Sequence, residues 1–498
     1  MPLNRDEGEY AYVGQLMLEG VAPFAEAWNM RLPGIYVVYA GMLAVFGQTA
    51  WGVHLGLIVA SVVSVVLIFV LGRRLFDDHV AWMAAAGYAV LSVGESVLGF
   101  AAYTEHFVVP FAVGGILLVM RAVERESAGA AFAAGVLLAA ALLVKQPGAL
   151  FIAFAAAWIA WQTRRGYPRW RSLMLALGAG VLLPCALTAG ALAWAGVFGR
   201  FWFWTVTYAW EYLRLRPVSS APGVLVEAVG AIVPPAWPLF ALAALGLAAP
   251  LWDGGAARRA PFLWLLAAAS VLSTLAGFYF RPHYFILLLP AMALLAGVGA
   301  GAFVRWLLGR GPVAEVAALV AVLALGATLF QQSDFLFRMP AGALTREAYH
   351  ANPYPEAVQV ARFLRELTAP TERVAVIGSE PEIYFYARRR AATGYLYVYP
   401  LMEPQRYARQ MQEEMIRQIE AAAPRYLVMV WVNYSWMAGE RSDPRLVAWA
   451  EEYKVRHFER VGVADIVSAD RTEYRWGPEA ATYAPRSRYW LEVLRRRS

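Results

Sequence analysis

Three carboxylates stand within four residues near the start of the chain: Asp6, Glu7 and Glu9. They open a segment, residues 6–20, in which apolar side chains recur at helical spacing, so the acids fall in the first turn of an amphipathic helix. A carboxylate held beside an apolar region can take the proton of a weakly nucleophilic hydroxyl. We therefore predict that Asp6 is a general base. A solvated acidic N-terminus is the alternative that these residues alone leave open.

Other polar residues stand at the ends of apolar segments later in the chain, where ionisable groups are costly and usually functional. Glu105 lies in Tyr103-Thr104-Glu105-His106, and Lys145 lies in Val144-Lys145-Gln146-Pro147. A loop at 197–223 and a later turn supply the rest, which are Trp202, Trp204, Tyr208, Trp210, Glu211, Tyr212, Arg214, Arg216, Arg281, His283 and Tyr284.

Each of these residues also has a purely structural interpretation. Lys145 and Arg281 can extend toward lipid head groups, and the aromatic residues of 201–212 can form an interfacial belt. His283 can be a neutral histidine inside a helix bundle. Glu105 can be an acid that the helix dipole favours. None of these interpretations explains why the residues fall on one side of the membrane, as the loop charges below predict.

The composition predicts a polytopic α-helical membrane protein. Of 498 residues, 60% are hydrophobic and only 16% are charged, whereas soluble domains have about 25% charged residues. About ten spans are expected within residues 51–330. We place them at 51–72, 79–98, 105–121, 129–143, 148–162, 171–196, 224–250, 260–280, 283–303 and 313–330. The single cysteine, Cys185, lies in an apolar run and excludes a disulfide framework.

Arginines fall in every second loop and orient the spans. They are Arg73, Arg74, Arg121, Arg125, Arg164, Arg165, Arg169, Arg171, Arg258, Arg259, Arg305 and Arg310. The positive-inside rule makes these loops cytoplasmic, so the net charge of +7 reflects topology and lipid head groups, with no indication of nucleic acid. Residues 1–50 are then external. An apolar helix over 33–47 would reach only about 22 Å, so we expect it to lie along the membrane surface.

Residues 345–498 are charged and mixed, and we expect them to form a soluble external domain. Helices are predicted at 355–368, 404–422 and 444–455, alternating with strands at 373–378, 425–432 and 457–467. Such alternation is typical of an α/β domain with a mainly parallel sheet.

The candidate residues suit the transfer of a sugar from a lipid phosphate. Lys145, Arg281, Arg214 and Arg216 are fixed cations that can meet the charge of a departing phosphate. Asp6 and Glu105 are carboxylates that can take or orient the acceptor proton. Aromatic rings can stack on a sugar and line a lipid groove. No sugar-nucleotide fingerprint is visible. No cofactor is required, and two or three carboxylates are a weak basis for a divalent cation or any other metal.

These motifs, in this order, resemble the membrane-embedded glycosyltransferases of the protein O-mannosyltransferase type, which include the bacterial aminoarabinose transferases. The resemblance covers about residues 5–330, and residues 372–396 are similar to the external C-terminal domain of bacterial members. It implies the GT-C fold and a polyprenyl-phosphate sugar donor.

The resemblance also implies roles for single residues. Asp6 and Glu7 match the family's Asp-Glu pair, with Asp6 as the presumed base. Arg31 stands where many members have a Lys before Pro, a suspected phosphate contact, and Lys145 matches the Lys of a Thr-Lys-Gly-Pro element. Glu105 stands where Asp is usual. The helix at 33–47 matches the second juxtamembrane helix of the family.

Two further features depart from the family pattern. Members normally carry a span before the Asp-Glu pair, so we expect the reading frame upstream of Met1 to encode one. Glu9 stands where aminoarabinose transferases carry Arg, which disfavours that particular substrate.

We therefore expect an inverting glycosyltransferase of the cytoplasmic membrane whose site and C-terminal domain are extracytoplasmic. Its acceptor would be a protein, a lipid or a glycan. Asp6, Glu105 and Glu7 are the catalytic candidates. Phosphate contacts are expected from Lys145, Arg31, Arg281, His283, Arg214 and Arg216, and a substrate groove from Tyr10, Tyr103, Trp204, Tyr208, Glu211 and Tyr284. The alternatives are a transporter or flippase of polyprenyl-linked sugars and a non-catalytic scaffold.

Overall fold

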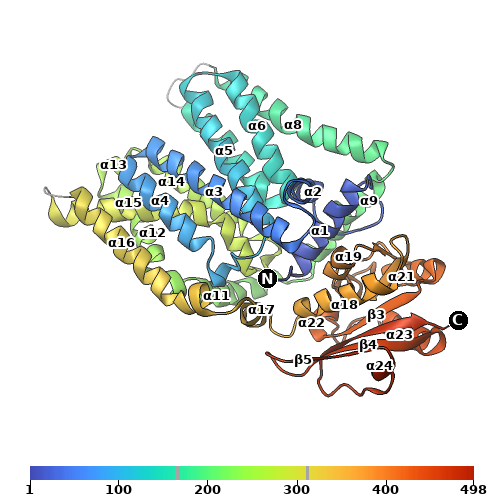
Figure 1. Cartoon of the computed structure of the whole chain (residues 1–498). Coiled ribbons are helices and arrows are strands. Elements are labelled where there is room, and N and C mark those ends of the chain that lie inside the picture. Colours follow the sequence, from blue (N-terminus) through green and yellow to red (C-terminus); the bar gives the residue numbers. More distant parts are fainter. Residues whose placement is uncertain (164–168, 310–312, 498) are drawn as a thin grey trace.

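The computed structural model describes residues 1–163, 169–309 and 313–497. Arg164, Arg165 and Arg310, which helped to orient the predicted loops, lie outside these residues. A helical bundle forms the first two thirds of the chain, and a C-terminal domain lies at one end of it, beside α1, with α13 at the other end (Figure 1).

The bundle begins with two helices that are too short to cross a membrane. The helices up to the aromatic loop are α1 (Arg5–Leu18), α2 (Pro33–Phe46), α3 (Ala50–Leu75), α4 (Asp78–Leu91), α5 (Thr104–Glu124), α6 (Ala128–Val144), α7 (Ala149–Thr163) and α8 (Trp170–Trp194). The later ones are α9 (Phe198–Trp202), a π-helical turn (Phe203–Tyr208), α10 (Ala209–Arg214), α11 (Ala221–Ile232), α12 (Trp237–Ala248), α13 (Gly254–Ala257), α14 (Ala260–Ser273), a 3-10 helix (Pro282–Leu287), α15 (Leu289–Leu308) and α16 (Val313–Gln331).

Six helical segments among the described residues are long and apolar enough to cross a membrane, so the protein is a multi-pass membrane protein. They are Ala50–Leu75, Thr104–Glu124, Trp170–Trp194, Val218–Leu251, Leu289–Leu308 and Val313–Gln331. Each of the ten expected spans overlaps a helix, but α4, α6, α7 and α14 are shorter than the segments that qualify. The span expected at 224–250 is interrupted at Pro234–Ala236, because proline cannot continue the hydrogen-bond ladder of a helix. The number of crossings remains a prediction.

The first helix, α1, begins at a complete capping box. The Asn4 side chain accepts hydrogen bonds from the backbone N–H groups of Asp6 and Glu7, and Glu7 accepts one from the Asn4 backbone. This reciprocal pair satisfies N–H groups that would otherwise lack partners at the start of the helix. It also fixes Asp6 in the first turn, as the spacing predicted.

The second helix, α2, is held against the end of α6. A Cβ on Gly34 would come within 2.5 Å of the Leu143 carbonyl oxygen. The Gln146 amide donates to the Met30 carbonyl oxygen at 3.1 Å. This close approach brings Arg31, two residues before α2, to the turn that carries Lys145.

The C-terminal domain contains α17 (Ala341–Tyr349), α18 (Tyr354–Leu367), α19 (Glu382–Ala387), α20 (Tyr399–Met402), α21 (Ala408–Ala422), α22 (Asn433–Trp436), α23 (Arg445–His457) and α24 (Pro478–Thr482). Its strands are β1 (Arg373–Ile377), β2 (Arg390–Ala391), β3 (Tyr426–Trp431), β4 (Phe458–Ile466), β5 (Thr472–Trp476) and β6 (Trp490–Arg496), in the sheet order β2-β1-β3-β6-β4-β5. The expected α/β class is confirmed.

The expectation of a mainly parallel sheet is wrong. Only β1 pairs in parallel, with β2 and β3, whereas β6 pairs antiparallel with both β3 and β4, and β4 pairs antiparallel with β5. Strands β5 and β6 were not predicted from the sequence, because charged residues interrupt the apolar residues along both of them. Because β6 inserts between β3 and β4, the third predicted strand runs against its neighbour.

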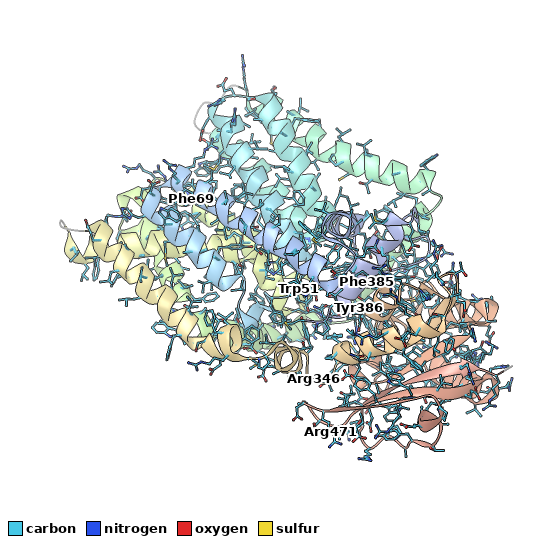
Figure 2. All side chains as sticks on the ribbon, in the orientation of Figure 1. Trp51, Phe69, Arg346, Phe385, Tyr386 and Arg471 are labelled. Carbon is cyan, nitrogen blue, oxygen red and sulfur yellow. The ribbon has the colours of Figure 1, made fainter. Side chains whose placement is uncertain are left out.

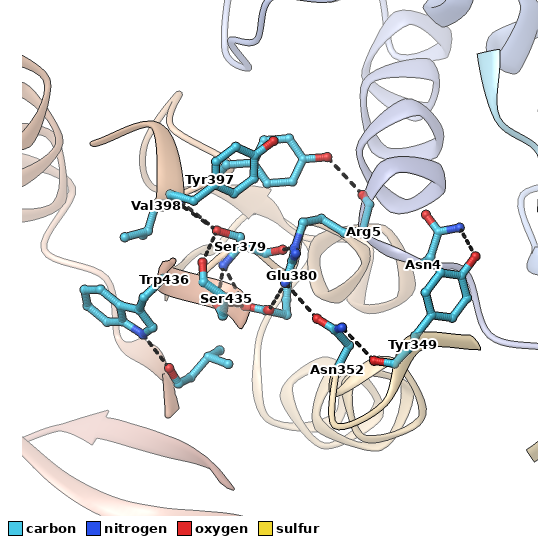
Figure 3. Close-up of polar contacts among 12 residues, drawn as sticks. Asn4, Arg5, Tyr349, Asn352, Ser379, Glu380, Tyr397, Val398, Ser435 and Trp436 are labelled. Atoms are coloured by element: carbon cyan, nitrogen blue, oxygen red, sulfur yellow. Dashed lines mark hydrogen bonds and ion pairs between the residues drawn. The ribbon is translucent and has the colours of Figure 1, made fainter. Parts of the chain in front are cut away.

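The C-terminal domain docks directly on α1. Arg5 forms an ion pair of 3.2 Å with Glu380 and donates through Nε to the Ser379 carbonyl oxygen (Figure 3). The Leu3 N–H donates to the Tyr386 hydroxyl at 2.8 Å, and Figure 2 shows Tyr386 and Phe385 where the domain meets the N-terminal helices. A Cβ on Gly8 would lie 2.6 Å from the Glu382 Cβ, so α1 and α19 are in backbone contact there.

We predict that Gly8→Ala weakens this docking and lowers the free energy of unfolding by about 1–3 kcal/mol, the usual effect of overpacking. The added methyl also faces backbone atoms of Glu382 at 2.7 and 2.8 Å, so a side-chain rotation cannot relieve the contact. Thermal unfolding of the full chain in detergent measures the loss.

Gly41→Ala on α2 is the matched control, since nothing lies within 4 Å of a Cβ there. Because Ala is a better helix former than Gly, this variant should keep the stability of the wild type or slightly raise it. Equal melting temperatures for the two variants would contradict the close contact at Gly8.

Candidate functional site

Asp6 faces a cation from the segment that precedes α2. The Arg31 Nη2 lies 3.2 Å from the Asp6 Oδ2, and both side chains keep some exposure, 17% and 19% respectively. The guanidinium also lies 5.7 Å from the centre of the Tyr10 ring. The buried Nε of Arg31 has no hydrogen-bond partner among the described residues, so Arg31 retains an unused donor beside Asp6.

A second carboxylate–cation pair joins α5 to the turn after α6. The Lys145 ammonium donates to the fully buried Glu105, whose other oxygen accepts from the Thr104 hydroxyl at 2.8 Å. The ammonium also lies 4.3 Å from the centre of the Tyr284 ring. A buried carboxylate needs such a cation, so Glu105 holds Lys145 in one place.

Arg31 and Lys145 line the same cavity, which has a volume of about 580 Å³. Tyr284, Tyr212 and Trp210 form aromatic walls. The remaining lining is largely apolar and includes Met30, Leu150, Val206, Leu213, Leu272 and Leu275. The cavity is therefore amphiphilic, with two cations among apolar and aromatic walls.

The other expected phosphate contacts lie around this cavity. Arg214 packs over Trp210, with 4.8 Å from its guanidinium carbon to the ring centre. Arg216 and Arg281 approach the Tyr279 ring at 4.8 and 5.7 Å. None of these arginines is among the described residues that line the cavity. Arg214 thus contacts a wall residue of the cavity, whereas Arg216 and Arg281 contact Tyr279, which stacks on the wall residue Tyr212.

Tyr103 and His283 form a stack beside the Glu105 pair. Their rings are 4.1 Å apart and nearly parallel, at 4°. The Tyr103 hydroxyl lies 3.4 Å from the Tyr349 hydroxyl. Both residues are buried. Through the ring stack and the hydroxyl contact, Tyr103 connects the start of α5 to the turn before α15 and to the C-terminal domain.

The aromatic segment 203–214 presents two different faces. Trp204, Tyr208 and Glu211, which we expected in a substrate groove, contact the C-terminal domain: the Tyr208 hydroxyl donates to Glu403 at 2.6 Å, and Glu211 pairs with Arg406 at 3.3 Å. The opposite face lines the cavity through Thr205, Ala209 and Tyr212. The i, i+4, i+7 spacing identifies a face, but sequence alone does not show what that face contacts.

The Glu7 carboxylate is occupied by structural contacts. Besides capping α1, it accepts from the Ala102 N–H at 2.7 Å and lies 3.5 Å from the His54 Nε2. It is 2% exposed. Glu7 therefore ties α1 to α3 and to the segment before α5, which favours Asp6 as the reactive member of the pair.

Two residues that reach the site, Glu9 and Tyr397, were not among the site residues expected from the sequence. Glu9 is fully buried, and burial raises the pKa of its carboxyl group from 4.5 to about 7. Tyr397 comes from the C-terminal domain and contacts both Glu9 and Asp6. The sequence placed Glu9 beside Asp6, but no signal linked either acid to a tyrosine almost 400 residues away.

Within residues 1–163, 169–309 and 313–497, no group of three or more His, Cys, Asp or Glu side chains is arranged to hold a metal ion.

Sequence comparison places the chain near two kinds of glycosyltransferase. Residues 31–194 match the family described as dolichyl-phosphate-mannose-protein mannosyltransferase. The chain is 28% identical over 260 residues to the undecaprenyl phosphate-alpha-4-amino-4-deoxy-L-arabinose arabinosyl transferase of Pseudomonas aeruginosa (strain LESB58), which covers 45% of each chain. The enzyme of strain UCBPP-PA14 is 29% identical over 220 residues, covering 40% of this chain and 38% of that one. These matches span less than half of the relatives.

Solved structures match nearly the whole chain. The crystal structure of ArnT from Cupriavidus metallidurans bound to undecaprenyl phosphate aligns with a TM-score of 0.60 and 15% identity, covering 99% of this chain and 94% of that one. The archaeal oligosaccharyltransferase AglB from Archaeoglobus fulgidus aligns with a TM-score of 0.54 and 13% identity, covering 96% and 71%. The expected fold is thus confirmed: this chain has the GT-C fold of ArnT and AglB, and residues 31–194 carry the sequence pattern of the mannosyltransferase family.

Proposed function

We propose that this protein is an inverting glycosyltransferase that moves a monosaccharide from a polyprenyl-phosphate donor to a hydroxyl of a protein, lipid or glycan. The observation that carries the proposal is the amphiphilic cavity lined by Arg31 and Lys145, each paired with a carboxylate, Asp6 and Glu105. The sequence relatives and the undecaprenyl phosphate in the ArnT structure support the same class of donor.

In the proposed step, Asp6 takes the proton of the acceptor hydroxyl as the oxygen attacks the anomeric carbon of the sugar. The bond from that carbon to the phosphate oxygen breaks on the opposite face, so the configuration inverts. The polyprenyl phosphate leaves as a phosphate monoester. Asp6 then releases its proton to solvent.

The two cations of the cavity suit the departing phosphate. The unused Nε of Arg31 and the ammonium of Lys145 are donors at fixed positions, and fixed cations stabilise developing negative charge without reorganisation. The apolar and aromatic walls offer a surface for the first isoprene units of the donor.

The site would work at the outer face of the cytoplasmic membrane, because the positive-inside rule makes the arginine-rich loops cytoplasmic and the site residues fall in the other loops. The C-terminal domain would then be extracytoplasmic, where it covers α1. No metal ion takes part in the proposed step.

We predict that Asp6→Asn lowers sugar transfer by about 10²–10⁴-fold, the usual contribution of a positioned base, because the amide keeps the shape of the carboxylate but cannot take a proton. Binding of undecaprenyl phosphate should persist within about two-fold. The assay incubates the purified chain with a panel of radiolabelled undecaprenyl-phosphate monosaccharides and membranes from a deletion strain, and follows label in the acceptor fraction.

Asp78→Asn provides the control, since Asp78 is exposed at the start of α4 and pairs with the exposed Arg73. Full transfer by Asp6→Asn would remove Asp6 from the mechanism. Movement of the intact donor across proteoliposomes, with no transfer in any variant, would favour the flippase alternative and contradict the proposal.

A second prediction separates the two roles of Lys145. Lys145→Gln should weaken undecaprenyl phosphate binding by about 10- to 100-fold, since a hydrogen bond to a charged group contributes about 1.5–3 kcal/mol. It should also lower the melting temperature, because Glu105 is left buried without its cation. Titration calorimetry with undecaprenyl phosphate in detergent and thermal unfolding measure the two effects.

The double variant Lys145→Gln and Glu105→Gln should recover the melting temperature but not the binding, because the buried charge is gone while the phosphate contact is still missing. Recovery of both would mean that Lys145 serves only to neutralise Glu105.

A further inference from the structure

One segment of the C-terminal domain, residues 395–403, reaches into the membrane part at several points. Tyr395 packs edge-on against Trp28 at 5.0 Å between ring centres, Tyr397 contacts α1, and Glu403 accepts from Tyr208. The domain thus contributes side chains to the neighbourhood of the proposed base as well as covering it. Figure 3 shows Tyr397 of this segment hydrogen-bonded to Arg5, the residue before that base.

The Tyr397 hydroxyl lies among three oxygen acceptors. It is 2.9 Å from the Glu9 Oε2, 3.1 Å from the Arg5 carbonyl oxygen and 3.4 Å from the Asp6 Oδ1. A phenol has a single hydrogen to donate, so it cannot serve both carboxylates at once. The shortest distance favours Glu9 as the acceptor when Glu9 is ionised.

Glu9 is enclosed by polar groups from every element around it. Asn29 donates to its Oε2 at 2.8 Å, and the Tyr36 hydroxyl donates to its Oε1 at 2.6 Å. The titratable and charged groups that face it are Asp6 and Tyr10 from α1, Arg31 from the segment before α2, Tyr36 and Tyr39 from α2, and Tyr397. Glu9 has no exposed surface, so its protonation can act only through these neighbours.

We propose that Tyr397 is a positioning residue for Asp6, and that the protonation of Glu9 decides which carboxylate receives the Tyr397 hydrogen. The proposal rests on the role of Asp6 in the proposed function. With Glu9 ionised, Tyr397 donates to Glu9 and leaves Asp6 free to take the acceptor proton.

When Glu9 takes up one proton, its own O–H donates to the Tyr397 oxygen, and the Tyr397 hydrogen turns to Asp6. No other bond changes. A carboxylate that accepts a hydrogen bond is held in its charged form and is a weaker base. Asp6 is therefore less reactive while Glu9 is protonated.

The pKa of Glu9, about 7 as a result of burial, places this exchange in the neutral range. Because Asp6 is the stronger base when Glu9 is ionised, the rate of transfer should rise with pH, with its midpoint at about pH 7. Arg31 opposes the effect of burial on Glu9, and its own guanidinium stays charged throughout this range.

The test measures label transfer by the full chain at saturating radiolabelled donor between pH 5.5 and 8.5. The wild type should show a several-fold rise centred near pH 7. Tyr397→Phe and Glu9→Gln should both lose this rise, with undecaprenyl phosphate binding unchanged within about two-fold. A Tyr397→Phe variant that keeps the wild-type pH profile would overturn the proposal.

Tyr386→Phe is the matched control, since Tyr386 also links the C-terminal domain to the start of α1 but contacts neither acid. It should keep the rise near pH 7 even if it lowers stability. Loss of the rise in Tyr386→Phe as well would reduce the Tyr397 effect to docking alone and would overturn the proposal.

A second measurement does not need transfer at all. Because the pKa of Glu9 is raised in the folded state, the folded chain holds an extra proton between about pH 4.5 and 7, and stability falls across that window as pH rises. Glu9→Gln should remove this fall. In Tyr397→Phe the fall should extend to higher pH, because ionised Glu9 loses a donor, and an unchanged window would contradict the Glu9–Tyr397 exchange.

The outcomes separate the two proposals. Active wild type and inactive Asp6→Asn, together with an unaltered pH profile in Tyr397→Phe, would overturn only the present inference. Full transfer by Asp6→Asn would overturn the role of Asp6 and, with it, the role assigned to Tyr397.

Discussion

An ionised carboxylate buried in an apolar bundle is costly unless a cation or hydrogen-bond donors face it, and this constraint determines how the site is built. Glu105 has no exposed surface, and Lys145 neutralises it. Because Lys145 also lines the cavity, the charge that satisfies the bundle is presented to whatever occupies that cavity. Arg31 repeats the arrangement with Asp6. The folding requirement and the proposed chemistry therefore use the same side chains.

Much of this arrangement was predictable from local sequence. The acids of α1 follow from helical spacing and a capping residue, and the turn at Lys145 follows from Pro147 between two apolar runs. The positive-inside rule grouped Glu105, Lys145 and His283 on one side, and Tyr103 and His283 do stack. The helix start and the turn agree with the structure because each rests on a period or a breaker within a few residues, whereas the side of the membrane stays a prediction.

The contacts that were not predictable join distant parts of the chain. Trp204 and Tyr208 were expected near the donor, yet they face Tyr395 and Glu403, because a helical face does not specify its partner. The edge strand β5 and the central strand β6 lack the apolar runs that revealed β1 and β3. Tyr397 meets Glu9 and Asp6 only in the folded chain.

The docking of α1 on α19 has a consequence for biogenesis. The residues that hold Arg5 and Gly8 in place, from Ser379 to Tyr397, emerge from the ribosome on the order of tens of seconds after them at typical elongation rates. During that interval the membrane helices can insert, but the first helix has no partner on one side. The acidic helix α1 is thus synthesised long before the segment that completes its surroundings, so an unfinished chain lacks the contacts of Tyr397 with Glu9 and Asp6.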